Sequence, residues 1–223
     1  MVNRFLFLIM AGGLLMAGWS SWQMFSGTGG VIQDKDRAQA ISENWDDTRY
    51  SEVYNETTSV DQKSSENETV AEENSLDEVK EYDYEKGEQV GELVIPKLER
   101  IYEIYWGTDD DTLDQGVGYH DSDFTTPPDG MRHTVLSGHR DTVFRKLGEL
   151  EDGDRFYMKF EEKEYEYQIR KTWITDADDR TVIVDKETPT LTLTTCYPFE
   201  YLGAAPDRYI IQAELIGVKD TIQ

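Results

Sequence analysis

The spacing of hydrophobic residues divides the chain into three parts. Residues 5–33 carry no charge and contain a strongly apolar run, whereas residues 34–90 are dominated by acidic, Ser, Asn and Thr side chains. Residues 91–223 contain short apolar runs separated by turn-forming residues, a pattern typical of β-strands. The pattern therefore predicts one β-rich catalytic or binding domain at residues 91–223, preceded by two segments of different character.

Short strands with few helices are predicted in the C-terminal part. Alternation is clearest at Tyr165, Tyr167 and Ile169, which would share one face of a strand. Short helices are expected at Thr112–Gln115 and Val143–Leu147. This composition indicates an all-β fold whose sheet closes into a barrel, because closure removes exposed edges. The expected strands are Glu92–Pro96, Ile101–Trp106, His133–Ser137, Arg155–Phe160, Tyr165–Ile174, Val182–Val184, Leu191–Thr195 and Tyr209–Leu215.

The apolar run near the N-terminus, FLFLIMAGGLLMAG, is followed by Trp19 and Trp22. About 20 apolar residues span a bilayer, and Trp favours its interfaces. Arg4 precedes the run and acidic residues follow it, which predicts a cytoplasmic N-terminus and an extracellular remainder. A cleaved signal peptide is the alternative, but no Ala-x-Ala site follows the run. We therefore expect residues 1–33 to be a single-pass anchor in the cell membrane.

An acidic segment follows this run. Residues 31–90 contain 18 Asp or Glu against 6 Lys or Arg, a net charge of −12. Such a segment buries too little apolar surface to offset the entropy of ordering it. We therefore expect residues 34–90 to be a flexible stalk, in which only a short helix around Ala38–Trp45 is compatible with the pattern.

The charge of the whole chain limits its partners. The formal net charge is −24, and nucleic-acid binding requires a cationic surface, so nucleic acid is excluded as a partner. Broad docking on anionic lipid is disfavoured for the same reason. A solubilising surface accounts for the charge equally well without any specific role.

The single cysteine, Cys196, is the first candidate for chemistry. A free cysteine is often a small buried hydrophobe. Here it ends an apolar β-type run, and Pro198 follows two residues later. Proline cannot donate a hydrogen bond to the sheet, so the strand should end there and leave the sulfur at the rim of the fold. A rim position in an exported protein favours a reactive thiol.

His139 and Arg208 are candidate partners of the thiol. His139 follows Gly138, whose missing side chain permits close approach of the backbone. A Cys/His pair within hydrogen-bond reach is the minimum for acyl transfer through a thioester. Arg208 opens the last expected strand and would donate to a developing oxyanion, since arginine stays protonated. A surface histidine and an exposed strand-edge cation remain the alternative interpretations.

Three strings together resemble the sortases, which are cysteine transpeptidases of Gram-positive cell surfaces. They are TLTTC at 192–196, SGHRD at 137–141 and the later Arg208, and the resemblance runs from about Gly91 to Lys219. The string GHRDTVFRKLGEL is similar to class D sortases of bacilli. The resemblance implies an eight-stranded β-barrel with an N-terminal membrane anchor and no cofactor.

The resemblance also implies the roles of the site residues. Cys196 would be the nucleophile, His139 the proton donor and acceptor, and Arg208 the stabiliser of substrate and oxyanion. Thr195 would help to position the substrate or the oxyanion. The string GVGYH places His120 one residue later than many sortases have this histidine, and one residue along a strand reverses the face, so His120 is left out of the catalytic set. His133 is interpreted as structural.

The implied partners follow from the family's reaction. Surface proteins with a C-terminal Leu-Pro-x-Thr-Gly/Ala-like sorting signal would form a thioester on Cys196, and an amine of a peptidoglycan precursor would resolve it. Pilus polymerisation is a variant of this outcome. The cluster Asp176, Asp178 and Asp179 is interpreted as a solvated acidic loop rather than a metal site.

Two other classes remain as rivals. An L,D-transpeptidase normally carries its cysteine in a Ser-x-Gly-Cys context, which Thr194 and Thr195 do not match. A non-catalytic anchored β-type binding module would explain the anchor, the stalk and the strands, but it would make the three strings coincidental.

Overall fold

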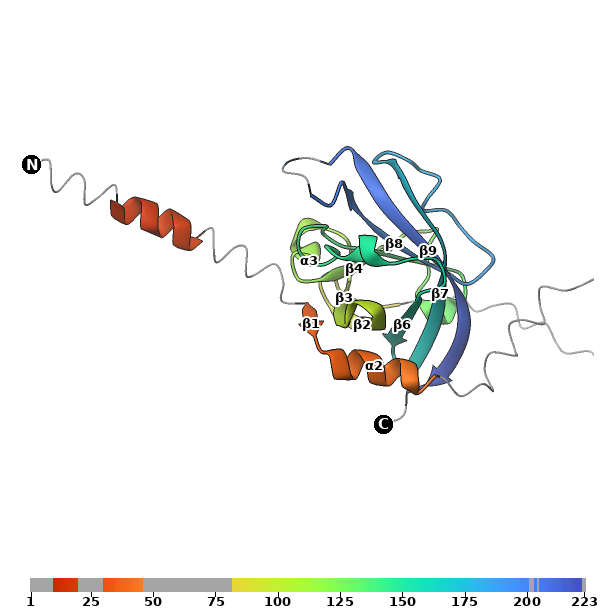
Figure 1. The fold of residues 1–223 in the computed structure, drawn as a ribbon. Coiled ribbons are helices and arrows are strands. Elements are labelled where there is room, and N and C mark those ends of the chain that lie inside the picture. Colours follow the sequence, from red (N-terminus) through yellow and green to blue (C-terminus); the bar gives the residue numbers. More distant parts are fainter. Residues whose placement is uncertain (1–9, 20–29, 46–81, 201–202, 204, 222–223) are drawn as a thin grey trace, which may run out of the picture.

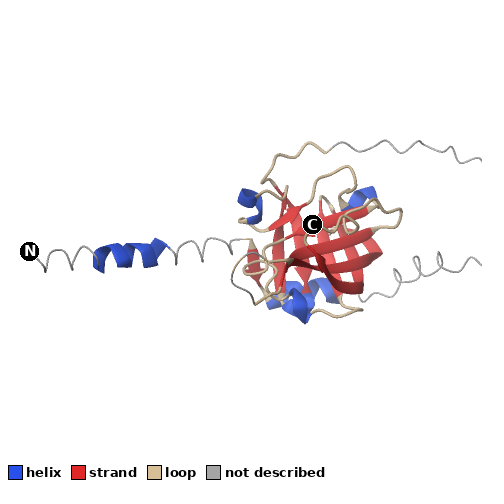
Figure 2. Cartoon of the chain, turned by 90° about the horizontal axis from the view of Figure 1, so that it is seen from above, coloured by secondary structure: helices blue, strands red, loops and turns tan. Residues whose placement is uncertain are grey.

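The computed structural model describes residues 10–19, 30–45, 82–200, 203 and 205–221, most of which build one β-barrel (Figure 1). Within these residues the strands are β1 (Val31–Gln33), β2 (Gln89–Ile95), β3 (Arg100–Trp106), β4 (Val117–Tyr119), β5 (His133–Ser137), β6 (Arg155–Phe160), β7 (Lys163–Asp176), β8 (Thr190–Tyr197) and β9 (Asp207–Asp220). Short helices lie in the connections between the strands, around the outside of the sheet (Figure 2). They are α2 (Lys35–Glu43), η2 (Pro96–Leu98), α3 (Asp110–Leu113), η3 (Pro128–Gly130) and η4 (Leu147–Glu149).

The strand order closes the sheet. The order is β1-β3-β2-β6-β7-β9-β8-β5-β4, and a further pairing of β3 with β4 joins the ends. Strands β2 to β9 thus form an eight-stranded barrel, with β1 added beside β4 along the same edge of β3. The pairs β3–β4 and β5–β8 are parallel and the others are antiparallel, so the barrel is mixed. The expected eight-stranded barrel is confirmed.

Large aromatic and aliphatic side chains fill the barrel. Tyr165, Tyr167 and Ile169 on β7 are each 1% exposed, which is the alternation expected from the sequence. Side chains of β3 and β8, such as Tyr102 and Leu193, reach the same core and are fully buried. Because alternate residues of each strand point inward, the barrel is rigid enough to present its strand ends as a fixed frame.

Several boundaries differ from the pattern-based expectation. Val182–Val184 is not a strand but part of the loop between β7 and β8, although the side chain of Val182 is buried. The short strands β1 and β4 were not expected, because three residues carry too little periodicity to detect. The helix expected at Val143–Leu147 appears as η4, shifted towards the C-terminus.

The segment expected to anchor the chain is described only in part. Residues 10–19 are helical and exposed, while residues 1–9 and 20–29 lie outside the described residues. In the part of the chain that the structure describes, no helix has the length and apolar character needed to cross a bilayer. Residues 31–33 belong to β1 and pair with β3, so an anchor extending to residue 33 does not agree with the structure.

Residues 30–45, here called the N-terminal arm, pack on the barrel instead of forming the start of a stalk. The helix α2 begins after Asp34, whose side chain accepts a hydrogen bond from the backbone N–H of Arg37 at 3.0 Å. Its buried residues Ala38 and Ile41, with Trp45, lie against Val94, Ile101 and Tyr157 of the barrel. The few apolar residues of this acidic stretch fall on one face of a helix, which suffices for docking. Most of the remaining expected stalk, residues 46–81, lies outside the described residues.

Trp45 is expected to hold the N-terminal arm on the barrel. Its ring is 7% exposed, lies 5.9 Å from the ring of Tyr157 and 4.5 Å from Nζ of Lys219. Replacing a buried Trp by Ala typically removes about 3 kcal/mol or more of stability. We therefore expect Trp45→Ala to lower the urea midpoint and to expose the arm to proteases, whereas the exposed α2 variant Glu43→Ala should not. Equal unfolding curves for the two variants would show that the arm adds no stability.

Candidate active site

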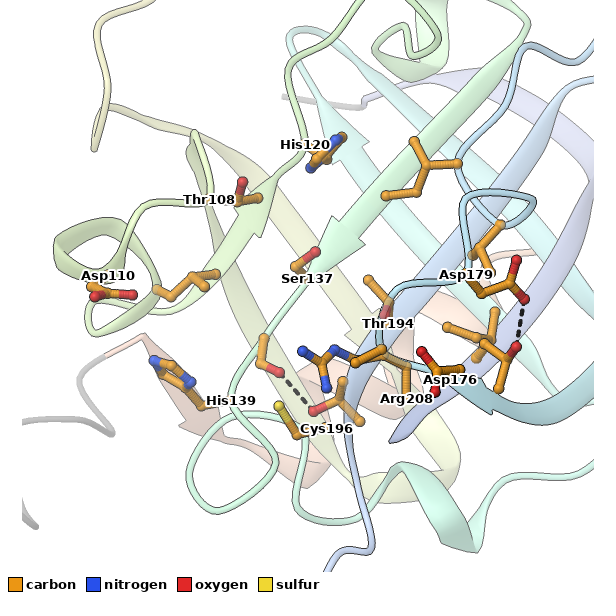
Figure 3. A pocket seen from close by; sticks show the side chains of 18 residues that line it. Thr108, Asp110, His120, Ser137, His139, Asp176, Asp179, Thr194, Cys196 and Arg208 are labelled. Carbon is orange, nitrogen blue, oxygen red and sulfur yellow. Dashed lines mark hydrogen bonds between the residues drawn. The ribbon is translucent and has the colours of Figure 1, made fainter. Parts of the chain in front are cut away.

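The barrel brings the three expected functional residues into one pocket. Strands β8 and β9 are antiparallel, and Cys196 lies directly opposite Arg208 in their register. Side chains of directly opposed residues project from the same face of a sheet. His139 follows the end of β5, which runs parallel to β8 with Ser137 opposite Thr194. All three line a pocket of about 500 Å³, and Figure 3 shows them together at one end of it.

The segment that carries His139 is tied to the strand that carries the thiol. The backbone N–H of Gly138 donates to the carbonyl of Thr194 at 3.2 Å, and the hydroxyl of Thr195 donates to the carbonyl of Gly138 at 2.6 Å. A Cβ on Gly138 would lie 2.8 Å from the ring of Phe144, so only glycine permits this approach. These contacts bring the histidine segment to the end of β8, although 57 positions separate His139 from Cys196.

Thr195 lines the same pocket, and its hydroxyl has a hydrogen-bond partner within the protein. Its side chain is 3% exposed, and its hydroxyl proton is already directed at Gly138. An oxyanion donor must instead direct its proton at the substrate. The hydroxyl therefore helps to hold the segment that carries His139. The position of Thr195 next to Cys196 in the sequence did not predict this contact.

Cys196 and Arg208 lie where their strands meet the loop that joins them. Strand β8 ends at Tyr197, as the following Pro198 predicts, and the thiol of Cys196 is half-buried and free of any disulfide. Nη1 of Arg208 donates to the carbonyls of Asp207 at 3.0 Å and Ala205 at 3.4 Å. These bonds leave other N–H groups of the guanidinium free to face the pocket, where Figure 3 shows it close to Cys196.

Asp114 lies beside His139 and was not singled out from the sequence. Its Oδ1 is 3.5 Å from Nε2 of His139, and it is the residue that caps the C-terminal end of α3. The carboxylate can interact favourably with a protonated imidazole at this distance, although both groups are accessible to water. Only the closure of β3 on β4 carries α3 to this place, so the sequence offers no local signal for the pair.

His120 also lines the pocket, contrary to the argument that excluded it (Figure 3). That argument assumed a strand that continues, but β4 ends at Tyr119, and alternation no longer fixes the direction of the next side chain. Burial lowers the pKa of His120, and the nearby Asp121 offsets this only in part. His120 is therefore a wall of the pocket, on the side away from His139.

The acidic loop that follows β7 also lines the pocket, next to Arg208, and is organised by its own hydrogen bonds. Asp179 accepts from the hydroxyls of Thr175 and Thr181, and these bonds lower the pKa of its carboxyl group. Asp176 accepts from the backbone N–H of Asp178 at 2.8 Å. Among the described residues no group of three or more His, Cys, Asp and Glu side chains is arranged to hold a metal ion.

His133 is fully buried and links two elements of the pocket wall. Its Nδ1 lies 2.6 Å from the carbonyl oxygen of Val184, and its Nε2 lies 2.8 Å from Oγ1 of Thr192. Because a carbonyl only accepts, Nδ1 must carry the proton and Nε2 must accept from the threonine hydroxyl. Burial lowers the pKa of His133 to about 4. The side chain is thus a neutral structural link, in agreement with its interpretation from the sequence.

The low pKa of His133 predicts a loss of stability in mild acid. In the unfolded chain a histidine binds its proton near pH 6.5, whereas the folded protein resists protonation down to about pH 4. Between these values the unfolded state binds more protons, so stability falls as the pH falls, by up to about 1.4 kcal/mol per pH unit. We expect His133→Asn to be less stable at pH 7 but to show a flatter decline from pH 6.5 to 4. Parallel declines in urea unfolding would contradict this assignment.

Comparison with known proteins gives a consistent result. The family model described as the sortase domain matches residues 93–216. Sortase D of Bacillus subtilis (strain 168) is 45% identical over 147 residues, which cover 64% of this chain and 73% of that protein.

Solved structures show the same similarity. The catalytic domain of B. anthracis SrtD is 54% identical and superposes with a TM-score of 0.56, covering 66% of this chain and all of that one. Sortase E1 of Streptomyces coelicolor, solved with a tripeptide in its active site, is 27% identical with a TM-score of 0.55 and covers 60% of this chain and 91% of that one. The residues matched by the sortase family model include all three candidate residues.

Proposed function

This chain belongs to the sortase family of cysteine transpeptidases, and on that premise we propose that Cys196, His139 and Arg208 are its catalytic residues. The substrate we propose is a surface protein with a Leu-Pro-x-Thr-Gly/Ala-like sorting signal near its C-terminus. The acceptor is an amine of a cell-wall precursor, so the product is a surface protein anchored to the wall. Similarity to Sortase D of B. subtilis supports a class D enzyme.

One observation carries this assignment. The only cysteine of the chain lies opposite Arg208 across β8 and β9, and His139 lines the same pocket. A nucleophile, a proton carrier and a fixed cation at one pocket end are the groups that acyl transfer requires. The ends of β8 and β9 hold Cys196 and Arg208 rigidly, which favours catalysis over the alternative of a binding module.

In the first half-reaction the thiolate of Cys196 attacks the carbonyl carbon of the signal's threonine. The carbonyl oxygen becomes negative, and the guanidinium of Arg208 donates hydrogen bonds to it. The carbon–nitrogen bond then breaks, His139 gives its proton to the departing amine, and a thioester remains. Oδ1 of Asp114 lies 3.5 Å from Nε2 of this imidazole, on the side open to solvent.

In the second half-reaction an acceptor amine attacks the thioester carbonyl. His139 takes a proton from the amine, the carbon–sulfur bond breaks, and the thiolate of Cys196 is restored with an amide as product. His139 is partly exposed and Asp114 is exposed, which leaves this side of the pocket accessible to an incoming amine. Pilus polymerisation would use the same steps with a lysine of another protein as the acceptor.

We also propose that the enzyme acts at the outer face of the cell membrane. The uncharged run within residues 1–33 supports an anchor, although the strand β1 limits it to residues before the N-terminal arm. The acidic residues that follow the run support an extracellular barrel.

The test is a peptide assay with the full chain in detergent. Peptides Leu-Pro-x-Thr-Gly and Leu-Pro-x-Thr-Ala, each with a fluorophore and a quencher, are incubated with and without an added diamine, and the products are identified by mass spectrometry. We expect cleavage after threonine and an amide of the added amine. Absence of both the thioester on Cys196 and the amide, with all such peptides, would refute the proposed reaction.

A further inference from the structure

Arg140 directly follows His139, and its guanidinium is almost completely buried. The residue is 8% exposed, Nη1 donates to the carbonyl of Pro198 at 3.0 Å, and Nη2 donates to the carbonyl of Gly203 at 2.8 Å. Both acceptors belong to the loop that joins β8 to β9 (residues 198–206). One side chain therefore connects the histidine segment with two points of the loop between Cys196 and Arg208.

The two connected segments lie outside the sheet. His139 follows the end of β5, and Pro198 follows the end of β8, so neither is held by strand pairing. The hydrogen bonds of Gly138 to β8 fix the base of the histidine segment, one residue before His139. Arg140 attaches the other end of this segment, one residue after His139, to the β8–β9 loop.

The loop itself has a second anchor that does not involve Arg140. Phe199 lies against Gly148 at η4, where a Cβ would come within 2.9 Å of its ring, and it packs edge-on against Tyr209 at 5.1 Å. Loss of Arg140 should therefore leave the loop attached to the barrel. What changes is the placement of the loop relative to His139.

We propose that Arg140 is a positioning residue. It fixes the position of His139 relative to Cys196 by hydrogen-bonding the histidine segment to the β8–β9 loop. The inference rests on the proposed roles of Cys196 and His139. A planar guanidinium reaches two carbonyls in a fixed geometry, and the bonds are strengthened by its charge. A lysine keeps the charge but presents a single flexible ammonium, which cannot reproduce the two-point clamp.

The consequence is a specific kinetic signature. Displacement of a reacting group by about 1 Å can lower the rate roughly 100-fold, even when binding is intact. Arg140 points into the loop and is not part of the pocket lining, so substrate affinity should change little. A residue that merely stabilised the fold would instead lower the melting temperature and leave kcat of the folded fraction unchanged.

The experiment compares Arg140→Lys and Arg140→Met with Arg145→Met, an exposed arginine of the same segment, in the full chain. We expect kcat to fall roughly 10- to 100-fold in Arg140→Met, less in Arg140→Lys, with KM within about threefold of wild type. Arg145→Met should match wild type. Low millimolar guanidinium should restore part of kcat to Arg140→Ala but not alter Arg145→Ala. Folding is checked by circular dichroism and by thermal unfolding above the assay temperature.

The outcomes separate this proposal from the assignment of the catalytic residues. A wild-type kcat in Arg140→Lys overturns the clamp, even if Arg140→Met does not fold. A change in KM alone also overturns it. If Cys196→Ala retains activity in the same assay, the proposed nucleophile is wrong, whereas an inactive Cys196→Ala beside a normal Arg140→Lys rejects only the role of Arg140.

Discussion

Replacing Cys196 by alanine is expected to abolish acyl transfer while the barrel stays folded. Cys196 is the only cysteine of the chain, so no other thiol can form the thioester. Its side chain is half-buried at the last paired positions of β8, where removal of one sulfur leaves no enclosed cavity. We therefore expect activity to fall to the level of the uncatalysed reaction, with little change in thermal unfolding.

Cys196→Ser sharpens this prediction. A serine hydroxyl is far less acidic than a thiol, so it attacks only when a strong, well-placed base removes its proton. The serine variant should therefore be nearly as inactive as the alanine variant. Peptide cleavage is measured together with mass spectrometry of the intact protein, which detects the thioester directly. Substantial turnover by folded Cys196→Ala would require another nucleophile.

Arg208→Ala is expected to lower the rate of thioester formation by roughly 10²–10³ at every pH, about 2.7–4 kcal/mol, as for other oxyanion donors. Arg208 lies opposite Cys196 in the β8–β9 register, and its guanidinium is anchored by the carbonyls of Asp207 and Ala205. A donor fixed in this way need not reorganise when the carbonyl oxygen becomes negative.

The pH profile distinguishes two roles for this cation. If Arg208 mainly stabilised the resting thiolate, its loss would displace the pH optimum and leave the peak rate nearly normal. If it stabilises the oxyanion, the whole profile should drop without a comparable displacement. Arg208→Lys should recover only part of the rate, because lysine lacks the planar fork. The measurement is thioester formation against pH for the three proteins, with circular dichroism as the control of folding.

Much of the barrel could be predicted, because most of its strands are long enough to show an alternation of apolar and polar residues. His133–Ser137 and Arg155–Phe160 were placed at their observed bounds, and the alternation of Tyr165, Tyr167 and Ile169 gave the inward face of β7. The stalk prediction was wrong for the N-terminal arm. Its three buried apolar residues lie in an acidic stretch, and their spacing alone does not show that the barrel presents an apolar surface on which they can pack.

The sequence by itself determined which side chains can perform the chemistry. Cys196 before a strand-ending proline, His139 after Gly138 and Arg208 at the start of the last strand are local features, since each depends on residue type and immediate neighbours. The tertiary structure alone decided how they meet. The parallel pairing of β5 with β8 carries His139 to the thiol, the closure of β3 on β4 brings Asp114 beside it, and Arg140 reaches across to Pro198 and Gly203. These contacts join residues distant in the chain, and their partners are set by the register of a closed sheet, which no local pattern specifies.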